Sequence, residues 1–284
     1  MAKAKATVKS SDYGDVCSQV MHSLSLKRRA RRWGLVVFLS FFYLVFLRSG
    51  PPVTPESYGR HIATVKVSGA VEGLSDGWYR QLELVSKSSN AAALLLVIDS
   101  PGGVVSIADA GYSILKRIHA RMPVVTVVGN TAASAGYLLA STGDVIFARE
   151  TSVVGSIGVL LEIPVFKNLL KNIGVEYRNI GVGDNLDVVP FQGLTEFTNK
   201  YLTLAGQDSY RWFRAIVQYE RRLSDQALSK VIGGKIFLGH EAVELGLIDD
   251  IGDQASAMSW LNKHDSSFTS STPVVDYSLF VSQG

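Results

Sequence analysis

Short runs of consecutive apolar residues recur along the chain after residue 60, and amphipathic stretches separate them. The run Ala93–Ile98 reads ALLLVI, an uninterrupted apolar segment that is typical of a strand buried on both faces. Strands of this kind that alternate with helical segments form a mostly parallel sheet with crossover helices. The sequence therefore predicts an α/β fold for this part of the chain.

The alternation also predicts where the individual elements lie. Strands are expected at Ile62–Val67, Ala93–Ile98, Val124–Val128, Asp144–Ala148 and Val175–Ile180. Helices are expected at Gly77–Lys87, Ser106–His119, Ala135–Thr142, Ile163–Asn172, within residues 194–231, at Gly239–Leu245 and at Gln254–Leu261. The Ser/Thr-rich segment after His264 is expected to be loose.

Composition and charge exclude several classes of protein. Hydrophobic residues make up 47% of the 284 residues and charged residues 19%, which excludes a disordered or collagen-like chain. The single cysteine, Cys17, excludes an internal disulfide framework and a multi-cysteine metal site. Residues 1–32 hold eight of the 28 basic residues and two of the 25 acidic ones, so this segment carries +6 and the remainder −3. A mildly acidic body argues against nucleic acid as a partner.

An apolar segment near the start of the chain predicts a membrane anchor. Trp33–Leu47 reads WGLVVFLSFFYLVFL, with the basic cluster KRRARR directly before it and Arg48 directly after it. Fifteen helical residues span about 22 Å, somewhat less than the roughly 30 Å hydrocarbon core. A cleaved signal peptide and a buried core helix are the alternatives, but the basic leader is long and no small-residue cleavage motif follows.

The favoured interpretation gives five segments. They are a cytoplasmic basic tail (1–32), a single transmembrane signal anchor (33–48), a Pro-rich stalk (49–60), a catalytic domain on the extracytoplasmic side (61–264) and a flexible tail (265–284).

Three glycine-rich junctions follow expected strands. Asp99–Gly103 reads DSPGG, and its two glycines permit a backbone that exposes N–H groups to an oxyanion or an extended peptide. Gly129–Tyr137 reads GNTAASAGY and places Ser134 among small residues that leave room for a substrate. Gly155–Val159 reads GSIGV and is typical of a tight turn, in which Ser156 is structural. The alternatives are that the first junction is a plain strand-to-helix turn and that Ser134 merely caps a helix.

Conventional catalytic partners for a serine are scarce. The five histidines, His22, His61, His119, His240 and His264, have no evident role as a base, and no G-x-S-x-G motif occurs. No zinc-binding H-E-x-x-H motif or P-loop occurs, so neither a metal nor an organic cofactor is expected. A serine hydrolase without a histidine needs another base, and a desolvated lysine is the usual one.

The order and spacing of these junctions resemble the S49-type serine peptidases, the family of signal peptide peptidase A. DSPGG, AASAGY and GSIGV occur in that family's order, and Gly234–Phe237 (GKIF) with Ala242–Asp249 (AVELGLID) resembles its C-terminal pattern. The resemblance covers roughly residues 62–262.

The resemblance implies a ClpP/crotonase-like fold and a catalytic site with assigned roles. Ser134 would be the nucleophile, Gly102 and Gly103 would line the substrate strand and supply an oxyanion-hole N–H, and the N–H of Ala135 would be a second donor. The implied substrates are remnants of signal peptides at the membrane. The implied assembly is a homo-oligomer, with a related subunit as a possible addition.

One departure from the family concerns the general base, which is a lysine some fifty residues after the serine. The matching stretch, Gly181–Pro190, reads GVGDNLDVVP and is followed by Leu194 and Thr195, which places Asn185 at the lysine position. An amide cannot accept a proton near neutral pH. The sequence leaves the base open among Lys167, Lys171, Lys235, a lysine of a partner subunit, and the weakly basic Asp184 and Asp187.

Two functions therefore compete. The first is a membrane-anchored serine endopeptidase that acts through Ser134, and the second is a pseudopeptidase that binds peptides or a partner subunit without cleaving them. An acyl-CoA enzyme of the crotonase type is weaker, because the serine junction and the C-terminal pattern resemble the peptidases.

Overall fold

The computed structural model describes residues 33–43, 54–74, 76–178, 180, 191, 193–269 and 271–281. The chain forms two units, residues 1–53 and residues 54–284. In the first unit, residues 33–43 form a helix whose apolar side chains, such as Phe38 and Phe42, are exposed. Within the described residues, no helix combines the length and apolar character that crossing a membrane requires. Residues 44–48 of the expected anchor lie outside the described part of the chain.

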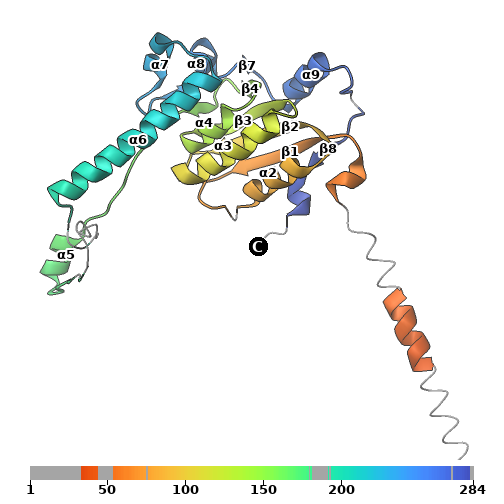
Figure 1. Cartoon of the computed structure of the whole chain (residues 1–284), viewed down its shortest axis with the longest axis horizontal. Coiled ribbons are helices and arrows are strands. Elements are labelled where there is room, and N and C mark those ends of the chain that lie inside the picture. The colour runs from red at the N-terminus through yellow and green to blue at the C-terminus, as the bar shows by residue number, and fades with distance from the viewer. Residues whose placement is uncertain are drawn as a thin grey trace, which may run out of the picture. The chain divides into compact units, whose positions relative to one another are not determined.

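The second unit contains a mixed sheet of eight strands (Figure 1). The strands are β1 (His61–Ser68), β2 (Ala91–Ser100), β3 (Val124–Ala133), β4 (Val145–Ala148), β5 (Val153–Gly155), β6 (Ile236–Leu238), β7 (Asp250–Ile251) and β8 (Val274–Asp276). Their order is β6-β5-β3-β2-β1-β8, with β4 beside β3 and β7 beside β4. Every pair is parallel except β5 with β6, so the predicted mostly parallel α/β sheet is confirmed.

Helices cover both faces of this sheet (Figure 1). The helical elements are η1 (Pro55–Tyr58), α2 (Gly77–Lys87), α3 (Val105–His119), α4 (Ala135–Ala140), α5 (Lys167–Asn172), α6 (Glu196–Glu220), α7 (Asp225–Val231), α8 (Gly239–Glu244), α9 (Gln254–His264) and η2 (Tyr277–Phe280). The larger core lies under α2, α3 and α4, whereas α9 covers a smaller core on the opposite face with Ala257 and Leu261. β2 contributes to both cores, which is why its sequence is apolar throughout.

β3 changes its pairing partner along its length. Its first half pairs with β4, and its last three residues, 131–133, pair with β5 instead. The chain leaves β3 at Ser134 and enters α4 directly. The junctions that the sequence analysis singled out therefore lie at neighbouring strand ends of a single sheet.

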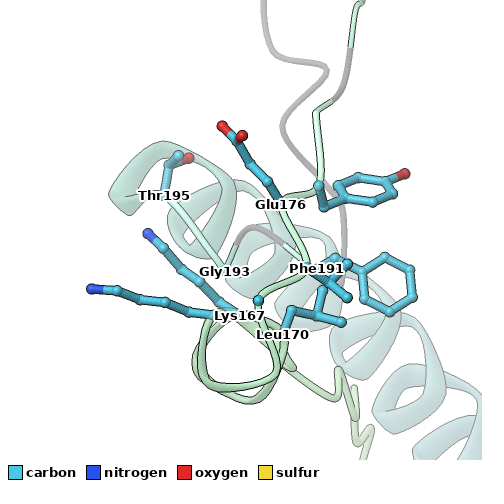
Figure 2. A pocket seen from close by; sticks show the side chains of 10 residues that line it. Lys167, Leu170, Glu176, Phe191, Gly193 and Thr195 are labelled. Atoms are coloured by element: carbon cyan, nitrogen blue, oxygen red, sulfur yellow. The ribbon is translucent and has the colours of Figure 1, made fainter.

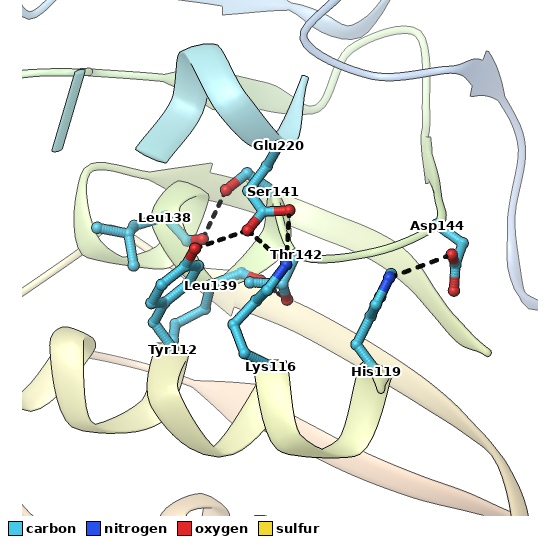
Figure 3. Close-up of polar contacts among 9 residues, drawn as sticks. All are labelled: Tyr112, Lys116, His119, Leu138, Leu139, Ser141, Thr142, Asp144 and Glu220. Atoms are coloured by element: carbon cyan, nitrogen blue, oxygen red, sulfur yellow. Dashed lines mark hydrogen bonds and ion pairs between the residues drawn. The ribbon is translucent and has the colours of Figure 1, made fainter. Parts of the chain in front are cut away.

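Polar contacts hold the C-terminal end of α6 against the core (Figure 3). The Glu220 carboxylate, whose side chain is 8% exposed, accepts a hydrogen bond from the Tyr112 hydroxyl at 2.7 Å and pairs with Lys116 at 2.9 Å. Burial, followed by the hydrogen bond to Glu220, raises the pKa of the Tyr112 phenol. The next residue, Arg221, forms two hydrogen bonds to the Asp249 carboxylate. α6 is thus fixed to α3 and to the chain before β7.

Three expectations for local structure are wrong. Residues 175–178 form no strand, since Val175 and Tyr177 are largely exposed and have no sheet to pack against. The helix expected at Ile163–Asn172 begins only at Lys167. Residues 274–277, in the segment after His264, are not loose, because Val274–Asp276 pairs with β1 and Tyr277 is fully buried.

The expected stalk also ends earlier than residue 60. Pro55 is buried, and η1 belongs to the same folded unit as the sheet.

Candidate active site

Ser134 lies at the junction between β3 and α4 in an unusual backbone conformation. Its φ of 50° and ψ of −121° fall outside the ordinary regions for a residue other than glycine. Its side chain makes no hydrogen bond to the helix that follows, so the alternative in which Ser134 merely caps α4 is wrong. Ser134 is half-buried and borders a cavity. Residues with strained backbone conformations of this kind concentrate at functional sites.

The double-glycine turn after β2 lies directly against Ser134. A Cβ atom added to Gly102 would lie 2.7 Å from Cβ of Ser134 and 3.3 Å from the backbone nitrogen of Ala135. Gly102 also has a φ of 114°, which a side chain would strain. The structure therefore brings together Gly102, Ser134 and Ala135, which are three of the five residues that the sequence analysis assigns to the site.

Some of the backbone N–H groups near Ser134 already donate a hydrogen bond, and others do not. The N–H of Gly102 donates to Oγ of Ser100 at 3.2 Å. Within the described part of the chain, the N–H groups of Gly103 and Ala135 have no hydrogen-bond partner. Of the two glycines, Gly103 therefore has the N–H that is available to an oxyanion.

The cavity beside Ser134 has a volume of about 970 Å³, which is enough for several residues of an extended peptide. One wall is the segment after Ser156, and the other is α6. The lining consists of Pro101, Ser134, Ser156, Gly158, Val159, Leu160, Leu161, Ile163, Leu194, Asn199, Leu202, Thr203, Gly206, Gln207, Tyr210, Gly233 and Gly234. Most of these side chains are apolar or small. None of these lining residues is a lysine, a histidine, an aspartate or a glutamate.

A second cavity of about 800 Å³ extends this space past Gly103. The two cavities share residues 159–161, Leu202 and Gly206. α6 comes close to residues 159–161 at Gly206, where an added Cβ would lie 3.4 Å from Cδ1 of Leu161. The site is therefore bordered by an elongated groove rather than by a closed pocket.

The sequence analysis missed the contribution of α6 to this groove. Asn199, Thr203, Gln207 and Tyr210 line the cavity at helical spacings of three and four residues. This polar stripe is visible in the sequence. Nothing in the sequence indicates that it faces Ser134 rather than solvent.

The three lysines that the sequence offers as candidate bases, and that the structure describes, do not line the cavity beside Ser134. Lys167 and Lys171 line a separate cavity of about 590 Å³ with Glu176 and Thr195 (Figure 2). The ammonium group of Lys235 donates to the carbonyl of Lys230 at 3.2 Å. The structure thus brings none of these three lysines to the cavity of Ser134.

The other two candidate bases, Asp184 and Asp187, lie outside the described residues, and so does Asn185 at the position of the family's lysine.

Ser156 lines the same cavity as Ser134, in a left-handed conformation with a φ of 54°. Its N–H donates to the carbonyl of Lys235 at 2.7 Å, which ties the third junction to the chain before β6. The sequence analysis assigned Ser156 a structural role, and this hydrogen bond agrees with that role. Ser156 is nevertheless one of the residues that line the groove.

The helix that follows Ser134 is firmly seated in the core. Tyr137 on α4 is fully buried, and its hydroxyl donates to the carbonyl of Leu247 at 2.8 Å. Burial raises the pKa of this phenol far above its ordinary value. No cluster of three or more potential metal ligands occurs among the residues that the structure describes.

Comparison with known proteins identifies relatives along most of the folded unit. The model of peptidase family S49 matches residues 116–267, and the model of the Clp protease family matches residues 61–152. A putative protease of Synechocystis is 33% identical over 203 residues, which are 71% of this chain and 73% of that protein. A putative signal peptide peptidase SppA of Enterococcus faecium is 31% identical, over 69% of this chain and 57% of that protein. Protease 4 of Haemophilus influenzae is 29% identical over 70% of this chain, which spans only 34% of that protein.

Proposed function

This chain belongs to peptidase family S49, a family of serine-type peptidases, and on that premise we propose that it cleaves peptides through Ser134. The observation that carries this proposal is the contact between the double-glycine turn and Ser134, with Cβ of a residue at position 102 only 2.7 Å from Cβ of the serine. A nucleophile beside unpaired backbone N–H groups has the arrangement that acyl transfer requires.

The proposed reaction has two steps. Oγ of Ser134 adds to the carbonyl carbon of the scissile bond while its proton passes to a base, and the N–H groups of Gly103 and Ala135 stabilise the resulting oxyanion. The C–N bond then breaks, and the leaving amine takes the proton. Water repeats the addition on the acyl-enzyme and releases the carboxylic acid product together with the free serine.

The base in this proposal is not among the side chains that line the described cavity, since that lining holds no lysine, histidine, aspartate or glutamate. Asn185 stands where the family has its lysine, according to the sequence pattern. The proposed source of the base is a lysine of a neighbouring subunit in an oligomer. An oligomer would also cover the exposed apolar residues of the groove and of α6, such as Leu160, Phe197 and Leu204.

The lack of a base among the residues that line the described cavity also supports a second candidate function. This function is that of a pseudopeptidase, which binds peptides or a partner subunit in the groove without cleaving them. General-base catalysis contributes roughly 10²–10⁴ in rate, so a site without a base retains binding and loses most of its turnover.

Covalent labelling with a fluorophosphonate distinguishes the two candidates. The peptidase is expected to give an adduct on Ser134, located by mass spectrometry, and Ser134→Ala is expected to give none. An unlabelled wild type together with a labelled Asn185→Lys variant favours the pseudopeptidase. Asn172→Lys, which adds the same charge on α5, is the matched control. Absence of labelling in both the wild type and Asn185→Lys contradicts Ser134 as a nucleophile.

The proposed substrates are signal-peptide remnants or other membrane-associated peptides, because the groove beside Ser134 is lined mainly by apolar residues. The proposed location is the extracytoplasmic side of a membrane, with residues 33–48 as a single-pass anchor. The basic cluster before this segment and the exposed apolar side chains of residues 33–43 support that topology. Flotation of the full chain with phospholipid vesicles after alkaline washing tests the anchor, and a chain that stays in the aqueous fraction contradicts it.

A further inference from the structure

A segment far from Ser134 in the sequence runs along the double-glycine turn. After β1 the chain continues beside residues 99–104, and Val71 forms an isolated parallel bridge with Gly103. The N–H of Val71 donates to the carbonyl of Gly102 at 2.8 Å, and the carbonyl of Val71 accepts from the N–H of Val104 at 2.8 Å. These two hydrogen bonds clamp the backbone of the turn from one side.

The clamp determines which way the peptide unit between Gly102 and Gly103 faces. In a trans peptide unit the C=O and the following N–H point in opposite directions, and the described chain has no cis peptide bond. Because the carbonyl of Gly102 is held toward Val71, the N–H of Gly103 points away from Val71. This N–H has no hydrogen-bond partner within the described part of the chain, and it directly follows Gly102, the residue that lies against Ser134.

The contact is too close for any side chain at position 103. A Cβ atom added to Gly103 would lie 2.2 Å from the carbonyl oxygen of Val71 and 2.7 Å from its backbone nitrogen. The second glycine of the turn is therefore required by its contact with Val71, whereas the first is required by its contact with Ser134.

The segment that holds the turn has its own anchor. One carboxylate oxygen of Asp76 accepts hydrogen bonds from the N–H of Gly73 at 3.1 Å and from Nε1 of Trp78 at 3.2 Å. Trp78 is 5% exposed, and its ring occupies the space beside Gly111 of α3. Asp76 thus links the segment that carries Val71 to the core between α2 and α3.

We infer that Val71 is a positioning residue: its backbone fixes the orientation of the Gly102–Gly103 peptide unit and so aims the N–H of Gly103 at the developing oxyanion, with Asp76 as the anchor of the clamp. The inference rests on the proposed function of Ser134. Without the hydrogen bond from Val71, the peptide unit is free to rotate and to withdraw its N–H from the site.

The test compares Val71→Pro with Val71→Ala. Proline removes the donating N–H and keeps an apolar ring, whereas alanine keeps the N–H and removes the core methyl groups. The rate of Ser134 phosphonylation at saturating fluorophosphonate is expected to fall on the order of 10²-fold in Val71→Pro and less than about threefold in Val71→Ala, with similar apparent affinity for the reagent in both. Amide hydrogen exchange of residues 102–105 is expected to rise only in the proline variant.

Asp76→Ala is the second variant, and it keeps the test valid if Val71→Pro does not fold. It removes the acceptor for Gly73 and Trp78 without touching the turn, and it is expected to slow phosphonylation about tenfold. Asp76→Asn keeps an oxygen acceptor and is expected to restore most of the rate.

Three results would overturn the inference. The first is an equal maximal rate of Ser134 phosphonylation in Val71→Pro and Val71→Ala. The second is a phosphonylation rate in Asp76→Ala that equals the wild-type rate. An unreactive wild type overturns the proposed function, and the catalytic role of the clamp with it. The exchange measurement then still reports whether Val71 holds the turn.

Discussion

The backbone N–H of Ser134 donates a hydrogen bond to the carbonyl oxygen of Gly155, with 2.9 Å between nitrogen and oxygen. This bond continues the pairing of β3 with β5 by one residue and joins the serine to the third glycine-rich junction. It also occupies the N–H of Ser134, so the donors that remain beside the hydroxyl come from the neighbouring residues. The backbone of Ser134 is therefore held by the sheet.

Replacement of Gly102 is expected to damage the site itself. In Gly102→Ala the new methyl group meets Cβ of Ser134 at 2.7 Å and the φ of 114° is strained, so Ser134 must move. We expect phosphonylation of Ser134 to slow on the order of 10²-fold, because misplacement of about 1 Å has effects of that size. Gly69→Ala is the control, since position 69 also has a left-handed φ, of 79°, but open space for a methyl group. A similar loss of rate in both variants would attribute the effect to backbone strain alone.

Breaking the partly buried ion pair between Arg221 and Asp249, at the end of α6, is expected to destabilise the fold. The Arg221 side chain is 7% exposed and pairs with Asp249 at 2.8 Å. Burial is the largest single influence and lowers the pKa of the guanidinium, but the hydrogen bond to Asp249 and the charges of Tyr137 and Asp249 together outweigh it and raise that pKa. Arg221→Ala leaves Asp249, which is 37% exposed, with the hydrogen bond from the N–H of Ile146 but without its cation. This change is expected to reduce the free energy of unfolding by about 1.5–3 kcal/mol in urea titrations. Arg211→Ala, which breaks the exposed pair with Asp208, is expected to change it by less than about 1 kcal/mol.

Alkaline pH is expected to unfold the protein partly through Tyr137. Burial raises the pKa of this phenol in the folded state above its ordinary value of 10.0. A raised pKa in the folded state gives stability that is complete below pH 10 and is lost as the pH rises further, since only the unfolded chain ionises readily. The free energy of unfolding is therefore expected to fall more steeply above pH 10 in the wild type than in Tyr137→Phe. Parallel curves for the two proteins would show that Tyr137 does not contribute.

The hydrogen bond between His61 and Tyr277 is expected to stabilise the edge of the sheet at β8. Nε2 of the buried His61 lies 2.9 Å from the Tyr277 hydroxyl, and its Nδ1 lies 2.7 Å from the carbonyl of Gly59. Tyr277→Phe leaves the ring in place and one buried nitrogen unpaired, which costs about 1–3 kcal/mol in the free energy of unfolding. Tyr219→Phe, at a residue that is 71% exposed, is the control and is expected to have almost no effect.

The long helices and strands of this fold were predicted well from the sequence, because the spacing of their apolar residues indicates which face of each element is buried. Gly77–Lys87 has the bounds expected of it, and β2 and β3 extend their predicted runs by a few residues at the ends. The strands β5 to β8 escaped prediction because runs of two or three residues carry no periodicity. Their pairing is decided by distant partners, as in the bridge from Val275 of β8 to Ala63.

The site was predictable in part for a topological reason. Parallel neighbouring strands bring their carboxyl ends together, so the glycine turn after β2 and the serine after β3 had to lie close to one another. The contribution of α6 and of Val71 was not predictable, because both reach the site through tertiary packing rather than through a motif.

The pairing of Ile62 with Val274 has a consequence for how the protein is made. The ribosome makes β8 (Val274–Asp276) long after β1 (His61–Ser68), so the flank of β1 that β8 will occupy stays open while the intervening chain is translated. During that interval the nascent chain exposes unpaired backbone groups that another polypeptide can bind. Translation of residues 274–276 is thus the event that closes this flank against aggregation.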